Sequence, residues 1–87
     1  MREIKFFHAQ WCKPCRKYIE NELPKIKKKY TVEMIDCQSN PFAADDYRVQ
    51  HLPTVLILEN GKEIYRGRDN AEKILEIMKN GKCSTIK

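Results

Sequence analysis

Trp11-Cys12-Lys13-Pro14-Cys15 places two thiols three residues apart, directly after a short apolar segment and directly before a segment with helical periodicity. This spacing predicts that Cys12 lies at the N-terminus of a helix and that Cys15 lies one turn inside it. A helix N-terminus offers unpaired N–H groups and about half a positive charge, and both stabilise a thiolate. Because a stabilised thiolate beside a second thiol can exchange disulfides, the pair predicts redox chemistry.

The rest of the chain alternates between strand-like and helix-like patterns. Residues 12–29 carry apolar side chains at helical spacing, and Pro24 within them lacks a backbone donor and predicts a kink. Asn60-Gly61 is the strongest hairpin signal, because both residue types tolerate positive φ. The expected elements are a strand at 4–8, a helix at 12–29, a strand at 31–37, a short helix after Asn40, strands at 54–58 and 63–66, and a helix from 71 that ends at Gly81.

Polar side chains are expected to cap two of these helices. Asn40 precedes Pro41, which is a favourable residue for a first helical turn, so Asn40 is expected to be the cap. Asp69 is expected to take the same role for the last helix, with Glu72 completing a capping box. The inward faces of these two helices are expected to carry Phe42, Ala43 and Tyr47 in the first, and Ala71, Ile74, Leu75 and Met78 in the second.

The order β-α-β-α-β-β-α predicts an α/β fold with one four-stranded mixed sheet. The first two strands flank a long helix, so they are expected to be parallel with a right-handed crossover. The last two strands are expected to form an antiparallel hairpin, with helices covering both faces of the sheet. We expect residues 1–81 to form one domain and residues 82–87 to form a flexible tail.

Composition narrows the function classes. The chain is 41% apolar and 33% charged, with a net charge of +5, which is typical of a soluble globular protein. Its longest apolar run, 55–58, is far too short for a membrane span, and the N-terminus lacks the apolar stretch of a signal peptide, so we expect a cytoplasmic monomer. A lysine cluster at 25–29 suits a solvated helix C-terminus, and we expect no binding of nucleic acid or membrane.

The residues around the two thiols resemble a known family. Residues 7–16, Phe-His-Ala-Gln-Trp-Cys-Lys-Pro-Cys-Arg, match the pattern F-x-A-x-W-C-x-P-C-[KR] of the thioredoxin family. Leu52-Pro53-Thr54 matches the segment that holds the family's cis-proline, and Asn60-Gly61-Lys62 matches its hairpin. The resemblance covers nearly the whole chain and implies a short, glutaredoxin-sized thioredoxin-like fold without the leading strand and helix of full-length members.

This resemblance implies roles for the motif residues. Cys12 would be the partly exposed nucleophile and Cys15 the more buried resolving thiol. Pro14 would fix the backbone between them. Lys13, in place of the family's common Gly, would favour thiolate together with Arg16. Trp11 would shield the site and offer an apolar docking surface.

The second implied part of the site is the segment 52–54. Pro53 would be cis and would lie against the two thiols, where it would keep metal away from them. It would also expose the Leu52 backbone, so that a substrate strand docks on Leu52, Pro53 and Thr54 by β-addition. The site would need no cofactor other than its own Cys12–Cys15 disulfide.

One departure from the family concerns a buried acid. The Asp that the family usually carries six positions before the first Cys is Phe6 here, and its usual Lys partner on the next strand is Met34. Both changes are apolar, which is consistent because replacing only one of the two would leave a buried charge without a partner.

The resemblance implies an oxidoreductase that takes electrons from a thioredoxin reductase or an equivalent donor and reduces protein disulfides. A glutaredoxin-type reductase that uses glutathione is an alternative, although its C-P-Y-C motif is absent. A metal-binding module is a further alternative, with Cys12, Cys15, Cys37 and a His as ligands. Otherwise Cys37 is expected to be a buried inert thiol, Cys83 an exposed thiol in the tail, and His8 and His51 surface residues.

Overall fold

The computed structural model describes residues 2–81, so the tail expected at 82–87, with Cys83, lies outside the described residues. Strands and helices alternate much as the sequence predicts. The elements are β1 (Arg2–His8), α1 (Lys13–Asn21), α2 (Leu23–Lys27), β2 (Val32–Asp36), α3 (Pro41–Asp46), β3 (Thr54–Glu59), β4 (Lys62–Gly67) and α4 (Ala71–Asn80).

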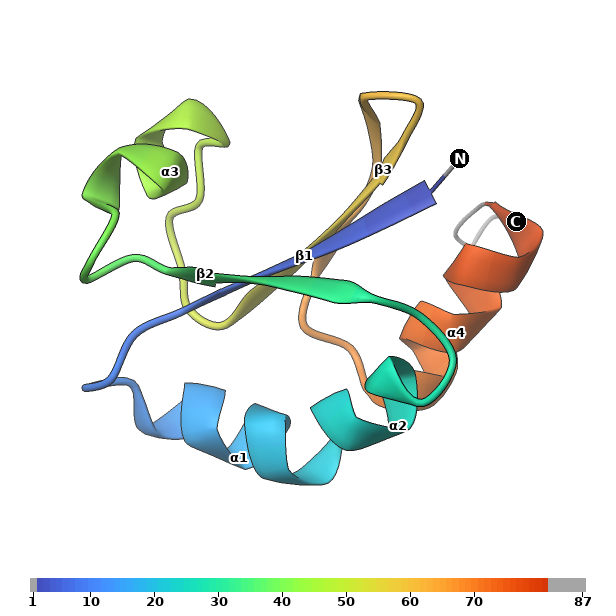
Figure 1. Cartoon of the computed structure of the whole chain (residues 1–87), viewed down its shortest axis with the longest axis horizontal. Coiled ribbons are helices and arrows are strands. Elements are labelled where there is room, and N and C mark those ends of the chain that lie inside the picture. The colour runs from blue at the N-terminus through green and yellow to red at the C-terminus, as the bar shows by residue number, and fades with distance from the viewer. Residues whose placement is uncertain (1, 82–87) are drawn as a thin grey trace.

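The strands form one mixed sheet in the order β2-β1-β3-β4. β1 and β2 are parallel, whereas β3 runs antiparallel to both β1 and β4. In Figure 1, α1, α2 and α4 lie on one side of this sheet and α3 lies on the other. The predicted four-stranded mixed sheet with helices on both faces is therefore confirmed.

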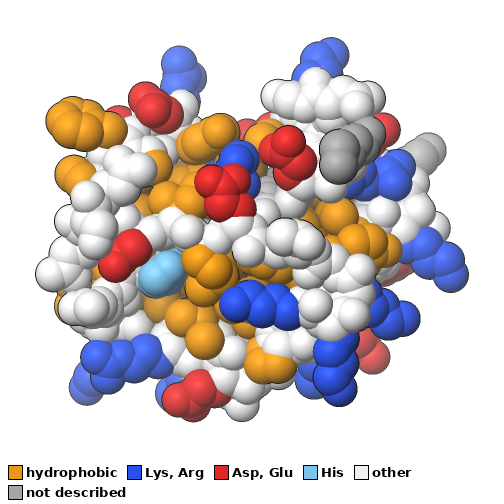
Figure 2. Space-filling model, in the orientation of Figure 1, with side chains coloured by type: hydrophobic (Ala, Val, Ile, Leu, Met, Phe, Trp, Pro, Cys, Tyr) orange, Lys and Arg blue, Asp and Glu red, His pale blue; other side chains and the backbone are white. Residues whose placement is uncertain are grey.

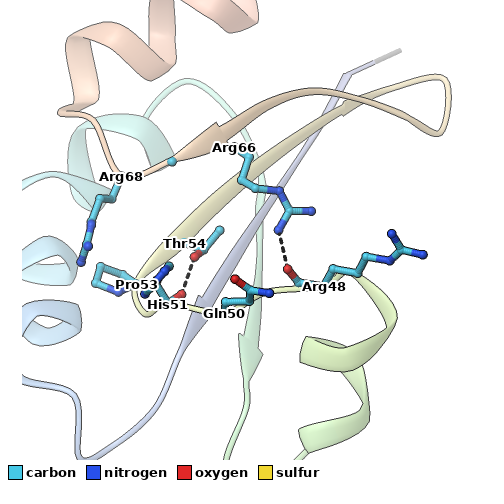
Figure 3. Close-up of a pocket in the computed structure, with 8 residues that line it drawn as sticks. Arg48, Gln50, His51, Pro53, Thr54, Arg66 and Arg68 are labelled. Atoms are coloured by element: carbon cyan, nitrogen blue, oxygen red, sulfur yellow. Dashed lines mark hydrogen bonds between the residues drawn. The ribbon is translucent and has the colours of Figure 1, made fainter.

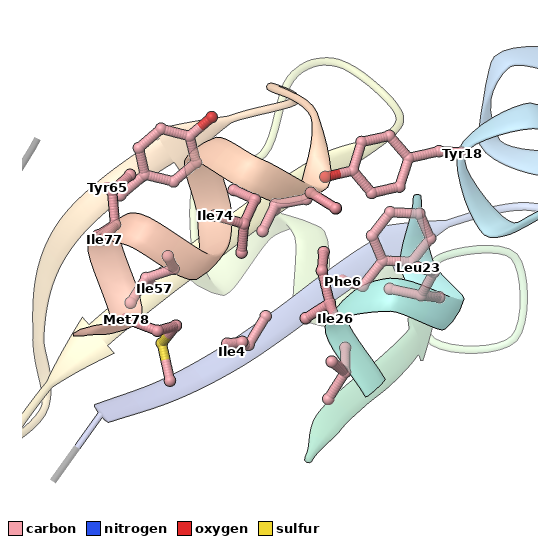
Figure 4. Packing of buried hydrophobic residues seen from close by; sticks show 13 residues of the cluster. Ile4, Phe6, Tyr18, Leu23, Ile26, Ile57, Tyr65, Ile74, Ile77 and Met78 are labelled. Atoms are coloured by element: carbon pink, nitrogen blue, oxygen red, sulfur yellow. The ribbon is translucent and has the colours of Figure 1, made fainter. Parts of the chain in front are cut away.

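Strand β3 explains why one apolar run is buried on both faces. Its side chains alternate between the two sides of the sheet, as they must in a strand. Val55 and Ile57 join the large core cluster under α1, α2 and α4, and Leu56 and Leu58 join a smaller cluster that includes residues of α3. Figure 4 shows the large cluster, in which Ile4 and Phe6 of β1 face Leu23, Ile26, Ile74 and Ile77 of the helices.

The expected single helix over 12–29 is in fact two helices. α1 ends at Asn21 and α2 begins at Leu23, with Glu22 as the shared boundary residue. Pro24 falls in the first turn of α2, where its missing N–H needs no partner. The proline therefore starts a new helix where the sequence predicted a kink in a continuous one.

The caps also differ from the prediction. Asn40 occupies the cap position of α3 but its side chain makes no capping hydrogen bond. Asn70, and not Asp69, caps α4, because its side chain accepts from the Lys73 amide at 3.1 Å. Asp69 instead accepts from the Tyr65 hydroxyl at 2.7 Å.

Two of the inward-facing assignments are wrong. Phe42 is 74% exposed, although its neighbours Ala43 and Tyr47 pack on the smaller cluster as expected. In α4 Ile77 is fully buried, as Ile74 is, whereas Leu75 is only half-buried. The buried face of α4 is thus formed by residues 71, 74, 77 and 78 in place of the predicted 71, 74, 75 and 78. Both sets fit the helical repeat, so the sequence pattern alone does not distinguish them.

Two turns follow the predicted chemistry. Asn60 and Gly61 have φ of 53° and 86°, as the tight hairpin between β3 and β4 requires. Gly81 ends α4 with φ of 78°, a left-handed conformation that favours glycine.

Phe6 and Met34 are paired positions of the β1–β2 ladder. Phe6 is fully buried and its ring stacks on Tyr18 at 5.3 Å between centroids, while Met34, on the edge strand, is 37% exposed. Aromatic packing thus fills the place at which the family resemblance implied a buried acid.

We predict that Phe6→Asp lowers the free energy of unfolding by at least about 4 kcal/mol at pH 7, because it removes a core ring and buries a charge. Burial raises the pKa of such a carboxyl above its unfolded value of about 3.9, so the loss should shrink as the pH falls toward that value. Urea unfolding from pH 4 to pH 7 measures both effects.

Two further variants are the controls. Met34→Lys alone should change stability little, because the side chain is partly exposed, and the double variant should recover part of the loss through their pairing. A Phe6→Asp protein as stable as the parent would contradict the burial of this position.

Candidate active site

Cys12 is the N-cap of α1. Its backbone is extended, with φ of −90° and ψ of 104°, and its sulfur accepts from the Cys15 amide at 3.3 Å. The Cys12 amide donates to the Ala9 carbonyl at 3.2 Å, which closes the turn between β1 and the helix. A sulfur in this position faces the unpaired N–H groups of the first helical turn, which stabilise negative charge.

Cys15 lies one turn inside α1, as the spacing predicts, and is fully buried. Burial, and next the adjacent Cys12 thiol, raise the pKa of Cys15 to about 12. Cys12, Cys15 and Cys37 are all free thiols in this structure. The inner thiol is therefore held protonated near neutral pH.

The exposure of the outer thiol differs from the prediction. Cys12 is 4% exposed, whereas the sequence predicted a partly exposed nucleophile. Ala9 and Leu52 pack against the two thiols and account for this cover. Trp11 is instead turned outward at 70% exposed, so its indole offers an apolar surface beside the site.

The basic and proline residues of the motif lie at the helix start. Lys13 and Pro14 are exposed in the first turn of α1, where the missing N–H of the proline needs no partner. Arg16 donates to the Gln10 carbonyl at 2.9 Å, so its guanidinium holds the preceding loop while its charge stays near Cys12.

The segment 52–54 completes the site. The Leu52–Pro53 peptide bond is cis, as the resemblance implied. Leu52 packs on the cluster that contains both thiols, and the Thr54 hydroxyl donates to the His51 carbonyl, which holds the turn. Pro14 and Pro53 also line one hollow of about 300 Å³ between α1 and the start of α4.

A family model described as Thioredoxin matches residues 4–80 of the chain. The chain belongs to the thioredoxin family. The predicted thioredoxin-like fold is confirmed by the same match and by solved structures, among them the X-ray structure of Fasciola hepatica thioredoxin. That structure is 30% identical, has a TM-score of 0.73, and is aligned over 93% of this chain and 81% of its own.

Thioredoxins of other organisms are similar in sequence. The thioredoxin of Chlamydia trachomatis is 33% identical over 66 residues, which cover 69% of this chain and 61% of that protein. The thioredoxin of Griffithsia pacifica is 37% identical over 62 residues, which cover 67% of this chain and 56% of that protein. The matched part thus spans about three fifths of these curated thioredoxins.

The alternative metal-binding set of cysteines and a histidine can be compared with the described residues 2–81. Among residues 2–81 the structure has no group of three or more His, Cys, Asp and Glu side chains that could hold a metal ion. Cys37 is half-buried next to Ile35 and Tyr47, and burial raises the pKa of its thiol. The metal-ligand set Cys12, Cys15, Cys37 and His is therefore not assembled in the described part of the chain.

The expectations about nucleic acid and membranes concern the surface charge and the helices. In Figure 2 the Lys and Arg side chains are spread over the visible face and are not gathered in one stripe. None of the helices within residues 2–81 combines the length and the apolar character needed to cross a bilayer.

Arg68 is a neighbour of the site that the sequence analysis did not select. It follows β4, and its guanidinium reaches the Leu52 carbonyl at 3.5 Å. No pattern in the sequence singled it out, because Arg68 lies just after the end of β4 and reaches Leu52 through the packing of two loops.

Cys12 and Cys15 should react with iodoacetamide at very different rates. With its pKa near 12, about one Cys15 in ten thousand is a thiolate at pH 8, so brief labelling of reduced protein should modify Cys12 and leave Cys15 free. Mass spectrometry of a variant in which Cys37 and Cys83 are replaced by Ala locates the label. Faster labelling of Cys15 than of Cys12 at pH 8 would contradict this order.

Proposed function

We propose that this chain is a thiol-disulfide oxidoreductase that reduces protein disulfides by dithiol exchange. One observation carries the proposal: the Cys12 sulfur caps α1 and accepts from the amide of Cys15, the second thiol of the pair. The helix end stabilises negative charge on Cys12, while burial keeps Cys15 protonated until it is needed.

In the first step the Cys12 thiolate attacks one sulfur of a substrate disulfide. A bond forms between Cys12 and that sulfur, and the other substrate sulfur leaves as a thiolate that takes a proton from solvent. The product is a mixed disulfide between protein and substrate. One disulfide bond has been broken and one has formed, so the number of disulfide bonds is unchanged.

In the second step Cys15 loses its proton and attacks the Cys12 sulfur. The Cys12–Cys15 disulfide forms, and the second substrate sulfur leaves as a thiolate and is protonated. The substrate has then gained two electrons and two protons, and the protein has lost them. Since Phe6 stands where the family usually has an acid, the proton of Cys15 must leave to water or to another group.

Docking is assigned to the surface around the thiols. Trp11 supplies an exposed apolar face, and Leu52, Pro53 and Thr54 form the turn against which a substrate strand would pair by backbone hydrogen bonds. This arrangement brings a substrate disulfide next to Cys12.

The electron donor in this proposal is a thioredoxin reductase or an equivalent enzyme. The proposed protein acts as a monomer in the cytoplasm, and its redox group is the Cys12–Cys15 pair. A donor test separates it from the glutathione-dependent alternative. Purified thioredoxin reductase with NADPH should regenerate the dithiol, whereas glutathione with glutathione reductase should do so poorly; the reverse result would favour a glutaredoxin-type protein.

We predict that reduced protein accelerates the reduction of insulin by dithiothreitol and that Cys12→Ser lowers the rate to that of dithiothreitol alone, because the nucleophile is lost. Cys37→Ser is the matched control and should leave the rate within about twofold, since it changes no reacting atom. Insulin turbidity measures all three proteins. An active Cys12→Ser variant together with an inactive Cys37→Ser variant would contradict the site.

The Cys15→Ser variant should stop after the first step, because no thiol remains to resolve the mixed disulfide. It should therefore accumulate as a covalent adduct with its substrates, which non-reducing electrophoresis detects and dithiothreitol releases. Absence of adducts from Cys15→Ser, when Cys12→Ser also forms none, would argue against Cys12 as the attacking thiol.

A further inference from the structure

A hollow of about 180 Å³ lies beside Pro53, on the side opposite the helix α1 (Figure 3). Its walls come from the turn that precedes β3 and from the end of β4. Basic side chains dominate its lining, which consists of Arg48, Gln50, His51, Pro53, Thr54, Arg66, Gly67 and Arg68.

Arg66 is a fixed part of this wall. Its guanidinium donates to the Tyr47 carbonyl at 2.6 Å and to the Arg48 carbonyl at 3.0 Å, and it forms a two-pronged ion pair with Glu63 at 2.9 Å. Four polar contacts of this kind leave the group little freedom and offset its charge. Arg66 therefore shapes the hollow and has little capacity to bind an anion.

Arg68 has most of its donors available. The structure gives it one hydrogen bond, to the Leu52 carbonyl, and at 3.5 Å that bond is long and weak. A guanidinium has five N–H donors in a fork that matches a carboxylate. Within residues 2–81 no carboxylate forms an ion pair with Arg68.

The nearby acids are occupied elsewhere. The Asp69 carboxylate accepts from the Tyr65 hydroxyl at 2.7 Å, and the Glu22 carboxylate accepts from the Ala71 amide at 2.8 Å. These acids therefore do not neutralise the positive charge of Arg68. Arg68 lines the hollows on both sides of Pro53.

Arg68 is connected to the two thiols through Leu52. It contacts the carbonyl of Leu52, and Leu52 packs directly on the cluster of Cys12 and Cys15. A substrate strand paired along the Leu52 backbone would have its reacting Cys at Cys12 and its neighbouring residues beside Arg68, because successive strand residues are only about 3.3 Å apart.

We propose that Arg68 forms an anion subsite that selects disulfide substrates with a carboxylate within two residues of the reacting Cys. The inference rests on the proposed function, since it assigns a substrate preference to the same site. The carboxylate belongs either to an acidic residue of a protein or peptide, or to the small peptide glutathione, and both present the same group to the guanidinium.

The test compares matched substrates. Two quenched-fluorescence peptide disulfides differ only in carrying Glu or Gln next to the reacting Cys, and glutathione disulfide is measured separately. Arg68 is exposed, so the parent should reduce the Glu peptide at most about fivefold faster in kcat/KM, which is the upper range for an exposed ion pair. Arg68→Gln should remove this preference, so that the Glu and Gln peptides are reduced at equal rates, and Arg68→Lys should restore part of it.

The net charge of +5 requires a control, because a basic protein attracts acidic peptides from a distance. Lys28→Gln removes the same charge at the end of α2 and should keep the preference. A preference retained in Arg68→Gln, or lost equally in Lys28→Gln, would overturn the proposal. An Arg68-dependent rate for glutathione disulfide but not for the Glu peptide would identify glutathione as the carboxylate source.

A binding measurement separates this inference from the proposed function. In a Cys12→Ser, Cys15→Ser protein, which cannot exchange disulfides, the S-methylated Glu peptide should shift the Arg68 side-chain N–H resonance in an NMR titration, and the Gln peptide should not. Equal shifts with both peptides would refute the subsite. Shifts with the Glu peptide alone would support it even if the parent reduced no disulfide.

Discussion

The hydrogen bond from the Cys15 amide to the Cys12 sulfur at 3.3 Å links the start of α1 to the chemistry of the site. In the proposed function, the sulfur that caps the helix is also the sulfur that attacks a substrate disulfide. Cys12 is held in this position by the hydrogen bond from its amide to the Ala9 carbonyl and by the packing of Leu52 against the two thiols. Strand β1, helix α1 and the turn before β3 must therefore all be in place before the Cys12 sulfur has its helix-end environment.

The apolar character of Phe6 extends this environment into the core. Its ring stacks on Tyr18 at 5.3 Å and on His8 at 5.8 Å, so no carboxylate lies at this point of β1. Burial then dominates the pKa of Cys15 and raises that of Tyr18 as well. The half of the site that faces the core favours neutral groups, and the half that faces solvent carries Lys13, Arg16 and Arg68.

The sequence predicted the sheet and the two-thiol helix start because each depends on local signals, such as the continuous apolar run of β3 and the Cys spacing. The cis bond at Pro53 was implied by the family resemblance. The sequence did not predict the cover over Cys12 or the contact of Glu22 with the start of α4. Leu52 reaches Cys12 from 40 positions away in the chain, and Glu22 reaches Ala71 from 49. Such contacts depend on how elements pack, which side-chain preferences at a single position do not encode.

The bond between Glu22 and Ala71 joins two helical segments that lie 49 residues apart in the chain. Glu22 separates α1 from α2, and its carboxylate lies at the N-terminus of α4, where the helix dipole favours it. Unwinding the first turn of α4 takes away the donor, and rearranging the α1–α2 junction takes away the acceptor. The two events are thermodynamically linked, so amide exchange in these segments should report one cooperative opening unit, and the Glu22 wall of the hollow at Pro53 belongs to that unit.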